Sequence, residues 1–497
     1  MLRDFFQDWP VGVTGPLLLG CLLSAWRLWV FTLKPWLWPC EPKEIPYWIP
    51  FIGHTISFFR NYTEIMENGL NSTGRTREPF AIQLLGEKLY ICTAPSDVST
   101  VFDDAVGFNF DNHLSNLLTS FGISEEALRR AWHEPKPGDW CYIPNNPVNP
   151  KQKSLIHCVE DIYRIQLLPG DHMDKWSRAF LNSVQTSLRG MQSLEFCATK
   201  YDSFVWGRDY VPRQVSLYLL VSFFSVQATA HAMFGPHLHE IDPLVVRHML
   251  SFNEHVWMIV FRCPNVFGLP VDEYRGKLMT IARKFVQLPK NERSQASWAI
   301  TNVLEGMEIV GMDTESKASM ILMIFWAAVS NEHNSCFWVL AHLLYDESLM
   351  KLAKQETEAG WRSGQLDIKY LCSNSPNLDS IFNEVLRLKN TAAAVRVASQ
   401  KTVLGGKPSR FLKKKSWARS PSFRPFGGGA TLCPGQTLAR HEVFGFIAVF
   451  FHRFHVSVAK DSVGRKPPFP RLNSMTPSFG LNGPMKGMDV IVDIAER

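Results

Sequence analysis

Long apolar stretches without proline or glycine dominate the pattern of hydrophobic and polar positions along this chain. Leu217 to Phe234 and Lys317 to Tyr345 are of this kind, and their length favours helices over strands. Two short runs, Phe80–Leu85 and Lys88–Thr93, flank a Gly-Glu pair and predict a β hairpin. The pattern therefore predicts one large, mainly helical domain with small β sheets.

The first apolar stretch, Val11 to Leu33, has a different character because it carries only one charge, Arg27. It is long enough to span a bilayer as a single helix, and Arg27 lies near one end, where its side chain can reach the interface. Tryptophans typical of an interfacial belt gather at that end: Trp26, Trp29, Trp36 and Trp38. A cleavable signal peptide is the alternative, but the start is weakly charged and no clear cleavage site follows.

The residues that flank this stretch predict its orientation. Lys34 and Lys43 follow it, whereas Arg3 before it is offset by two aspartates, so the bulk of the protein is expected in the cytosol. Five prolines from Pro35 to Pro50 exclude a helix and predict a semi-stiff spacer. The expected organisation is a luminal tip and transmembrane anchor over residues 1–34, a proline-rich hinge over 35–54 and a globular domain over 55–497.

Composition narrows the classes of function. The chain has 497 residues, 46% of them hydrophobic, and its net charge of +6 comes without the dense basic run of a nucleic-acid binder, so no nucleic-acid partner is expected. Its ten cysteines include no CxxC pair, which argues against a zinc site and a disulfide scaffold. The catalytic part of the chain is therefore expected in a reducing compartment.

The segment from Phe426 to Gly435 reads FGGGATLCPG and matches the pattern FxxGxxxCxG at Phe426, Gly429, Cys433 and Gly435. It resembles the haem-binding loop of the cytochrome P-450 family, which implies that Cys433 is the axial ligand of a haem b iron. A thiolate ligand favours O–O bond cleavage, and glycines let backbone N–H groups approach the sulfur. The alternatives are a buried structural cysteine and a phosphate loop, which lacks its GK[ST] ending.

Other segments extend the resemblance over most of the chain and imply the mainly helical cytochrome P-450 fold. Glu384 and Arg387 form an ExxR pair whose spacing places both on one helix face. The family implies that Arg410 completes this ion-pair lock and that Arg396 pairs with a haem propionate. A solvated surface salt bridge is the alternative for the ExxR pair and for Arg396.

The segment from Trp326 to Trp338 reads WAAVSNEHNSCFW and places Asn331 where most relatives carry the alcohol of a proton-relay pair. This frame resembles the branch of sterol 7α- and 12α-hydroxylases and prostacyclin synthase, and also filamentous-fungal members. Gln436 departs from the branch, which usually has arginine there. Asn331 can position water or a peroxide oxygen but cannot act as a strong acid.

Two chemistries stay open, together with a third class of function. The first is hydroxylation or oxidation of a lipophilic sterol, terpenoid or secondary metabolite with O2 and with electrons from NADPH through a reductase, at the endoplasmic reticulum membrane. The second is the rearrangement of a lipid peroxide, and the third is a binding protein without activity. Basic residues before the ligand are candidates for the reductase surface: Lys413, Lys414, Lys415, Arg419 and Arg424.

A gap near 407/408 qualifies the resemblance. Only 46 residues separate Arg387 from Cys433, which is short for the family. Lys401 to Lys407 looks like the start of a hairpin, yet the PxRF-like segment with Arg410 follows at once. Loss of the intervening strand leaves a sheet edge unpaired. We therefore hypothesise that the chain as written folds poorly or holds haem weakly.

Overall fold

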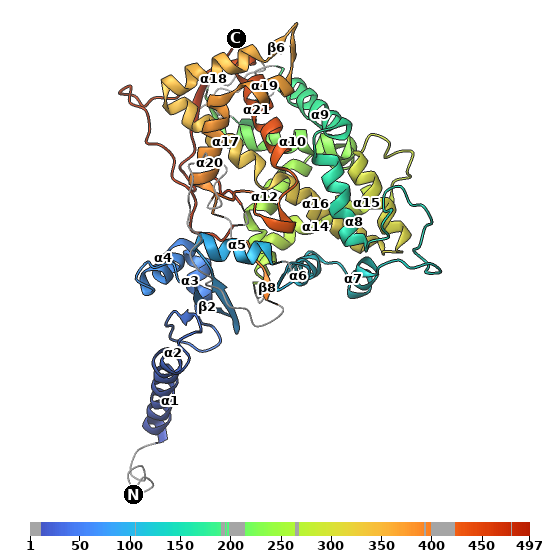
Figure 1. Ribbon diagram of the computed structural model, residues 1–497. Coiled ribbons are helices and arrows are strands. Elements are labelled where there is room, and N and C mark those ends of the chain that lie inside the picture. Colours follow the sequence, from blue (N-terminus) through green and yellow to red (C-terminus); the bar gives the residue numbers. More distant parts are fainter. Residues whose placement is uncertain are drawn as a thin grey trace, which may run out of the picture. The chain divides into compact units, whose positions relative to one another are not determined.

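A computed structural model describes residues 11–104, 106–189, 194, 196–197, 214–263, 268–391, 394–398, 423–478 and 480–497. The chain divides into two compact units, and each is described by itself. Among the described residues, the first unit holds 11–104 and 474–477, and the second unit holds the rest. Figure 1 colours both along the sequence.

The first unit begins with the predicted apolar helical segment, but the helix runs past Leu33 to Leu37 and includes Pro35, where the sequence predicted no helix. Pro35 is tolerated because it lies in the first turn of the short helix Lys34–Leu37. Its helices and strands are α1 Val11–Leu28, η1 Trp29–Leu33, α2 Lys34–Leu37, β1 Lys43–Glu44, α3 Thr55–Arg60, α4 Tyr62–Ser72, β2 Phe80–Leu84, β3 Glu87–Ile91 and α5 Pro95–Asp103. The predicted hairpin is β2–β3, and β1 adds to it in parallel. Gly15–Leu37 is long and apolar enough to cross a membrane and is not buried.

Arg27, the one charge of the apolar segment, binds within the first unit. Its guanidinium donates to the backbone carbonyl of Tyr47 and lies 4.2 Å from the centre of the Trp48 ring. A cation over an aromatic face is stabilised electrostatically. The charge therefore ties the helical segment to the proline-rich segment that follows it.

The second unit contains most of the helices. They are α6 Asp111–Phe121, α7 Glu125–Trp132, α8 Leu155–Leu167, α9 Asp171–Ser187, α10 Leu217–Phe234, α11 His237–Ile241, α12 Val245–His255, α13 Trp257–Val260, α14 Pro270–Gln287, α15 Trp298–Ile309, α16 Thr314–Val329, α17 Glu332–Tyr345, α18 Glu347–Ala359, α19 Ile368–Asn374, α20 Pro376–Lys389, the 3-10 turn η5 Gly429–Thr431 and α21 Gln436–Arg453. The fold is mainly helical, as predicted.

The sheets of the second unit are small. Strand β10 Ile491–Glu496 pairs with β9 Phe454–Val458 and with β5 Gln214–Ser216. Strand β4 Phe108–Asn109 pairs with β8 Val397–Ala398, and β6 Trp361–Arg362 with β7 Gln365–Leu366. These sheets have only two or three strands each. Two of them connect segments that are distant in the sequence, and none forms a separate layer of the fold.

The core of the second unit is built around α10, which is apolar on all sides and 72% buried. Helices α9 and α17 pack against α10, and α21 packs against both of them. Fully buried aromatic rings from these helices fill the core, among them Phe180, Phe234, Phe337, Trp338, Phe444, Phe446 and Phe450. This four-helix centre fixes where the cysteine loop before α21 and the start of α17 lie.

One detail of the predicted helices differs. The apolar stretch from Lys317 to Tyr345 is not one helix, because α16 ends at Val329 and α17 begins at Glu332. Asn331 occupies the break with a φ of −115°. The polar run SNEHNS lies at this point, and its side chains form hydrogen bonds outside the helix. These bonds compete with the regular backbone hydrogen bonds of a continuous helix.

Candidate functional site

The cysteine loop is a compact turn that places Cys433 just before α21. The Cys433 N–H donates to the Phe426 carbonyl at 2.9 Å, which closes the loop. Gly427 and Gly429 adopt φ values of 78° and 62°, a conformation that favours glycine. Phe426 packs against the core of the second unit. The four positions matched by the motif thus occupy one structure, in which the thiol stands at the N-terminal end of an 18-residue helix.

The Cys433 side chain is exposed to solvent, although enough protein surrounds the sulfur for desolvation to raise the pKa of its thiol. The Gly435 backbone N–H lies close to the sulfur and opposes that rise. A Cβ at Gly435 would stand 3.6 Å from the sulfur, so this backbone approach is close. An accessible sulfur with a backbone donor, at a helix N-terminus that favours negative charge, suits a thiolate ligand of haem iron. The residues present therefore fit the group.

Arg396 reaches this loop from β8. Its guanidinium donates to the Thr431 hydroxyl, two residues before Cys433, and lies 5.2 Å from the centre of the Phe110 ring. Partial burial lowers the pKa of Arg396. His113 on α6 also lies in reach of its charge, and burial followed by the Arg396 charge lowers the pKa of His113. The structure thus brings the predicted propionate partner beside the cysteine loop, together with a histidine that the sequence did not single out.

Asn331 is held by the C-terminal segment from Gly480 to Asn482. Its Oδ1 accepts the Leu481 N–H at 2.8 Å, and its Nδ2 donates to the Ser330 hydroxyl at 3.1 Å. Gly480 packs so closely that an added Cβ would stand 1.6 Å from Asn331 Oδ1. The amide that the sequence offered for binding water or a peroxide oxygen is therefore in contact with the protein backbone.

The same segment also binds the next two turns of α17. Asn334 Nδ2 donates to the Leu481 carbonyl at 3.0 Å, and Trp338 Nε1 donates to the Asn482 carbonyl at 2.8 Å. Tyr218 on α10 donates its hydroxyl to Asn334 Oδ1 at 3.1 Å. One face of α17 is thus fixed along its first half.

The end of α20 connects the two predicted halves of the site. The Asn390 side-chain amide donates to the Pro425 carbonyl, at the start of the cysteine loop, at 3.0 Å. The Thr391 N–H donates to the Gly480 carbonyl at 3.1 Å. The two residues that follow α20 therefore join the cysteine loop to the segment that holds Asn331.

The predicted ion pair forms on α20. Arg387 makes two hydrogen bonds to Glu384, at 2.6 and 2.8 Å, and these lower the pKa of Glu384 and raise that of Arg387. The side chains are 52% and 53% exposed, so the pair is solvated. Arg410, the predicted third member, lies outside the described residues, as do Lys413, Lys414, Lys415 and Arg419.

Comparisons with known proteins agree with this geometry. The cytochrome P-450 family model matches residues 407–481, which include the whole cysteine loop and the segment that holds Asn331. The chain is similar to cytochrome P-450 monooxygenase poxD of Penicillium oxalicum, at 21% identity over 84% of this chain and 88% of the relative. It is also similar to cytochrome P-450 7A1 of Oryctolagus cuniculus, at 24% identity over 90% and 92%. A third relative, the cholesterol 7-alpha-monooxygenase of Cricetulus griseus, is 23% identical over 89% and 91%.

The chain resembles the cytochrome P-450 family. It is an oxidoreductase, and its relatives are named monooxygenases. The family implies a haem iron and electrons from a redox partner. Both resemblances predicted from the residues, to fungal members and to sterol hydroxylases, are confirmed.

Sequence reasoning missed several residues that the structure places at the two halves of the candidate site. Gly480 and Leu481 hold Asn331, Asn390 binds the cysteine loop, and His113 lies near Arg396. No local pattern marks them, because their partners lie tens to hundreds of residues away along the chain.

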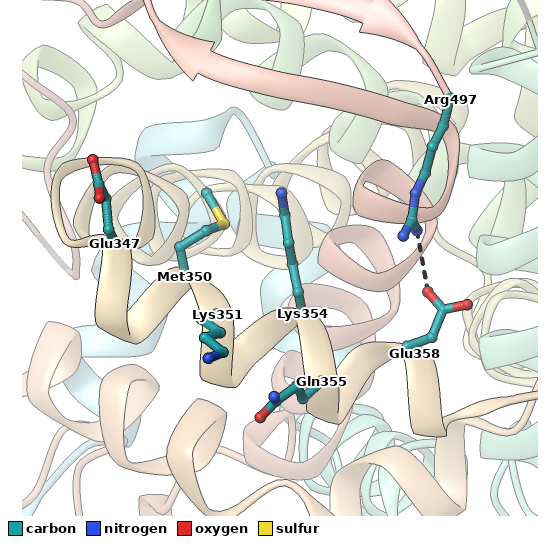
Figure 2. A pocket seen from close by; sticks show the side chains of 7 residues that line it. All are labelled: Glu347, Met350, Lys351, Lys354, Gln355, Glu358 and Arg497. Carbon is teal, nitrogen blue, oxygen red and sulfur yellow. Dashed lines mark hydrogen bonds and ion pairs between the residues drawn. The ribbon is translucent and has the colours of Figure 1, made fainter.

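A surface depression of about 460 Å³ lies on α18 beside the C-terminal residue (Figure 2). It is lined by Glu347, Met350, Lys351, Lys354, Gln355, Glu358 and Arg497. Arg497 pairs with Glu358 at 3.1 Å across it. None of these residues belongs to the predicted site, and no group of three or more His, Cys, Asp or Glu side chains in the described part of the chain could hold a metal ion.

Proposed function

We propose that this P-450 is a membrane-anchored haem-thiolate monooxygenase that oxidises a lipophilic substrate with O2 and electrons delivered from NADPH by a reductase. The observation that carries the proposal is the Cys433 sulfur, accessible at the N-terminal end of α21 with the Gly435 N–H beside it. Haem bound there supplies the oxygen chemistry. The protein holds the thiolate, and the glycine loop and Phe426 shield its surroundings.

The other predicted residues have supporting roles in this proposal. Arg396 beside Thr431 is placed to pair with a haem propionate by a charge-assisted hydrogen bond. Asn331 lines the opposite side of the site and positions water or bound oxygen through its amide. Glu384 and Arg387 form the structural ion pair of α20.

The substrate class and location follow from the anchor and the relatives. The apolar helical segment Gly15–Leu37 is long enough to span a bilayer, with the tryptophans Trp26, Trp29, Trp36 and Trp38 toward its end. We infer a single-pass anchor in the endoplasmic reticulum membrane with a cytosolic catalytic domain. Relatives that include a cholesterol 7-alpha-monooxygenase favour a sterol, a terpenoid or a fungal secondary metabolite.

Asn331 supports a second candidate, the rearrangement of a lipid peroxide. Its amide accepts from Leu481 and donates to Ser330, and it offers no acid for proton delivery to O2. Peroxide rearrangement needs neither such an acid nor reductase electrons. This chemistry explains the residue at position 331 without a separate proton source.

The carbon monoxide difference spectrum of the reduced protein tests the proposed function, because it reports thiolate ligation and folding together. We expect a thiolate-type band, followed by substrate oxidation that requires both NADPH and reductase. A band with peroxide turnover in the absence of NADPH would select the isomerase. A haem-loaded protein without the thiolate band would contradict both chemistries.

A further inference from the structure

A tyrosine in the first turn of the core helix α10 reaches the structure that holds Asn331. The Tyr218 hydroxyl donates to Asn334 Oδ1 on α17 at 3.1 Å. Its ring packs edge-to-face on Phe337, one turn further along α17, with the ring centres 5.1 Å apart. Gly483 packs against the hydroxyl, since a Cβ there would stand 2.5 Å from the Tyr218 oxygen. The hydroxyl therefore lies between α10, α17 and the C-terminal segment.

The main chain of Tyr218 is fixed as well as its ring. Asp489 Oδ1 accepts the Tyr218 N–H at 3.0 Å, and Asp489 Oδ2 accepts the Ser216 hydroxyl. The first of these bonds satisfies a backbone donor at the start of α10 that has no partner within the helix. Because backbone and ring are both held, the side chain directs its hydroxyl toward one place.

Asn334 is the residue that this hydroxyl orients. Its Nδ2 faces two carbonyl oxygens, that of Leu481 at 3.0 Å and that of Ser330 at 3.3 Å. Carbonyl oxygens only accept, so the amide presents its NH2 group to them and its oxygen to Tyr218. Asn334 is 3% exposed, and its oxygen depends on a donor from the protein. Burial raises the pKa of Tyr218, although the Ser222 hydroxyl opposes that rise, so the phenol keeps the proton that it donates.

Leu481 connects Asn334 to Asn331. Its carbonyl accepts from Asn334, and its N–H donates to Asn331 Oδ1 at 2.8 Å. Gly480 packs against the same oxygen of Asn331, because a Cβ there would stand 1.6 Å from it. Asn331 Nδ2 donates one hydrogen to Ser330, and its second hydrogen has no partner in the described part of the chain. The amide oxygen of Asn331 is thus engaged by the backbone, and one donor hydrogen is left to use.

We propose that Tyr218 is a positioning residue, whose hydroxyl acts through Asn334 and Leu481 to hold Asn331 with an Nδ2 hydrogen available as a donor. The oxygen atom that receives this hydrogen bond belongs to water or to a peroxide substrate. The donor role of Asn331 rests on the proposed function, because only that function gives the amide such an oxygen to bind. The hydrogen bonds from Tyr218 to Asn331 do not rest on it.

Hydrogen exchange at the Leu481 amide tests this series of contacts, with Tyr218→Phe as the variant. Phenylalanine keeps the ring contact with Phe337 and removes only the hydroxyl, so the buried oxygen of Asn334 loses its donor. An unsatisfied buried acceptor is unfavourable, and Asn334 then no longer fixes the Leu481 carbonyl. We expect exchange at Leu481 to rise about tenfold.

Two controls accompany this measurement. Exchange at Ala459, whose N–H donates to the Ile491 carbonyl at 2.9 Å in the same unit, should not change. Tyr163→Phe on α8 is the matched variant, because the Tyr163 hydroxyl is buried and has no partner among the described residues. This variant should leave exchange at Leu481 as it is in the wild type.

A double variant separates positioning from a general loss of stability. Asn334→Ala breaks the same connection, so Tyr218→Phe added to it should raise exchange at Leu481 no further. Effects that multiply would show that Tyr218 does not act through Asn334. An equal rise at Ala459, or no rise at Leu481 in Tyr218→Phe, would also overturn the positioning role.

Turnover of cumene hydroperoxide by the haem-loaded protein tests the consequence for Asn331. We expect Tyr218→Phe to lower kcat about tenfold with KM nearly unchanged, and to have no further effect when Asn331→Ala is already present. An equal loss in both backgrounds would overturn the connection to Asn331. A wild type without hydroperoxide turnover or a thiolate band would contradict the proposed function and the donor role, whereas exchange at Leu481 still decides the series of contacts.

Discussion

The cysteine loop and the Asn331 break are assembled from the chain in opposite ways. The closing hydrogen bond of the loop joins Phe426 to Cys433, seven residues apart. The break depends on Leu481 and Gly480, about 150 residues further along the chain. A local site keeps its shape wherever its own segment folds. A site such as the Asn331 break forms only when distant segments are correctly placed. It is therefore more sensitive than the cysteine loop to substitutions elsewhere in the chain.

The largest expected effect concerns the local site. Cys433→Ala removes the only sulfur of the loop, and the thiolate-type carbon monoxide band should be lost completely. Cys40→Ala is the matched control, because Cys40 is also exposed but lies in the proline-rich segment. Absorption spectra of both variants at equal protein concentration provide the measurement. A thiolate band that persists in Cys433→Ala would remove the basis of the site.

The second prediction concerns the predicted gap near 407/408. It lies between the hairpin start at Lys401 to Lys407 and the PxRF-like segment that contains Arg410. The family model match begins at residue 407, at the predicted junction, and the missing segment stays a prediction. Insertion of a relative's intervening segment should raise haem content several-fold and raise the unfolding temperature, because it pairs an exposed sheet edge. An inserted glycine-serine segment of equal length is the control. Equal haem content and stability in all three proteins would show that the gap is tolerated.

The third prediction tests the Asn331 break directly. Gly480→Ala should lower the free energy of unfolding by about 1–3 kcal/mol, because the new Cβ meets Asn331 Oδ1. Adding Asn331→Ala should recover part of that loss, since the clash disappears. Gly276→Ala is the control, because a Cβ there meets nothing within 4 Å. Denaturant unfolding of the wild type, both single variants, the double variant and the control yields the coupling; additive effects would contradict the contact.

A charge-reversal experiment tests the prediction that basic residues before Cys433 bind the reductase. Replacing Lys413, Lys414 and Lys415 by glutamate should slow reduction by the reductase about tenfold at low salt, because a basic surface steers an acidic partner. The same reversal at the exposed residues Lys136, Lys151 and Lys284 is the control. Stopped-flow reduction at several salt concentrations provides the rates. Equal rates in both triple variants would exclude the basic patch.

The smallest effect is expected at the ion pair of α20. Glu384→Gln should leave the unfolding midpoint of the chain unchanged within error, because both partners are about half exposed and screened by water. In the chain with the inserted segment the same substitution should be clearly destabilising, if Arg410 then completes a buried lock. Thermal unfolding of the two backgrounds side by side distinguishes these cases.

The sequence predicted much of the fold and the local half of the site. Helix α10 was located to the residue, and the β2–β3 hairpin within a few residues, because each follows from a local pattern of apolar positions. The motif placed the four loop residues together for the same reason. The break at Asn331 was not foreseen, since Gly480 and Leu481 create it from outside the apolar stretch.

Helix α10 has a consequence for how the nascent chain is handled. Its mean hydropathy of 1.4 approaches the 1.6 of the N-terminal segment, so by composition alone it is a second candidate to enter a bilayer. Helix α9 is synthesised before it, but α17 follows roughly 100 residues later, which is about 5–20 s at ordinary translation rates. If the first segment anchors the chain as proposed, α10 is synthesised close to the membrane insertion machinery before α17 exists to cover it. Pairing with α9, against which α10 packs, would then compete with entry into lipid.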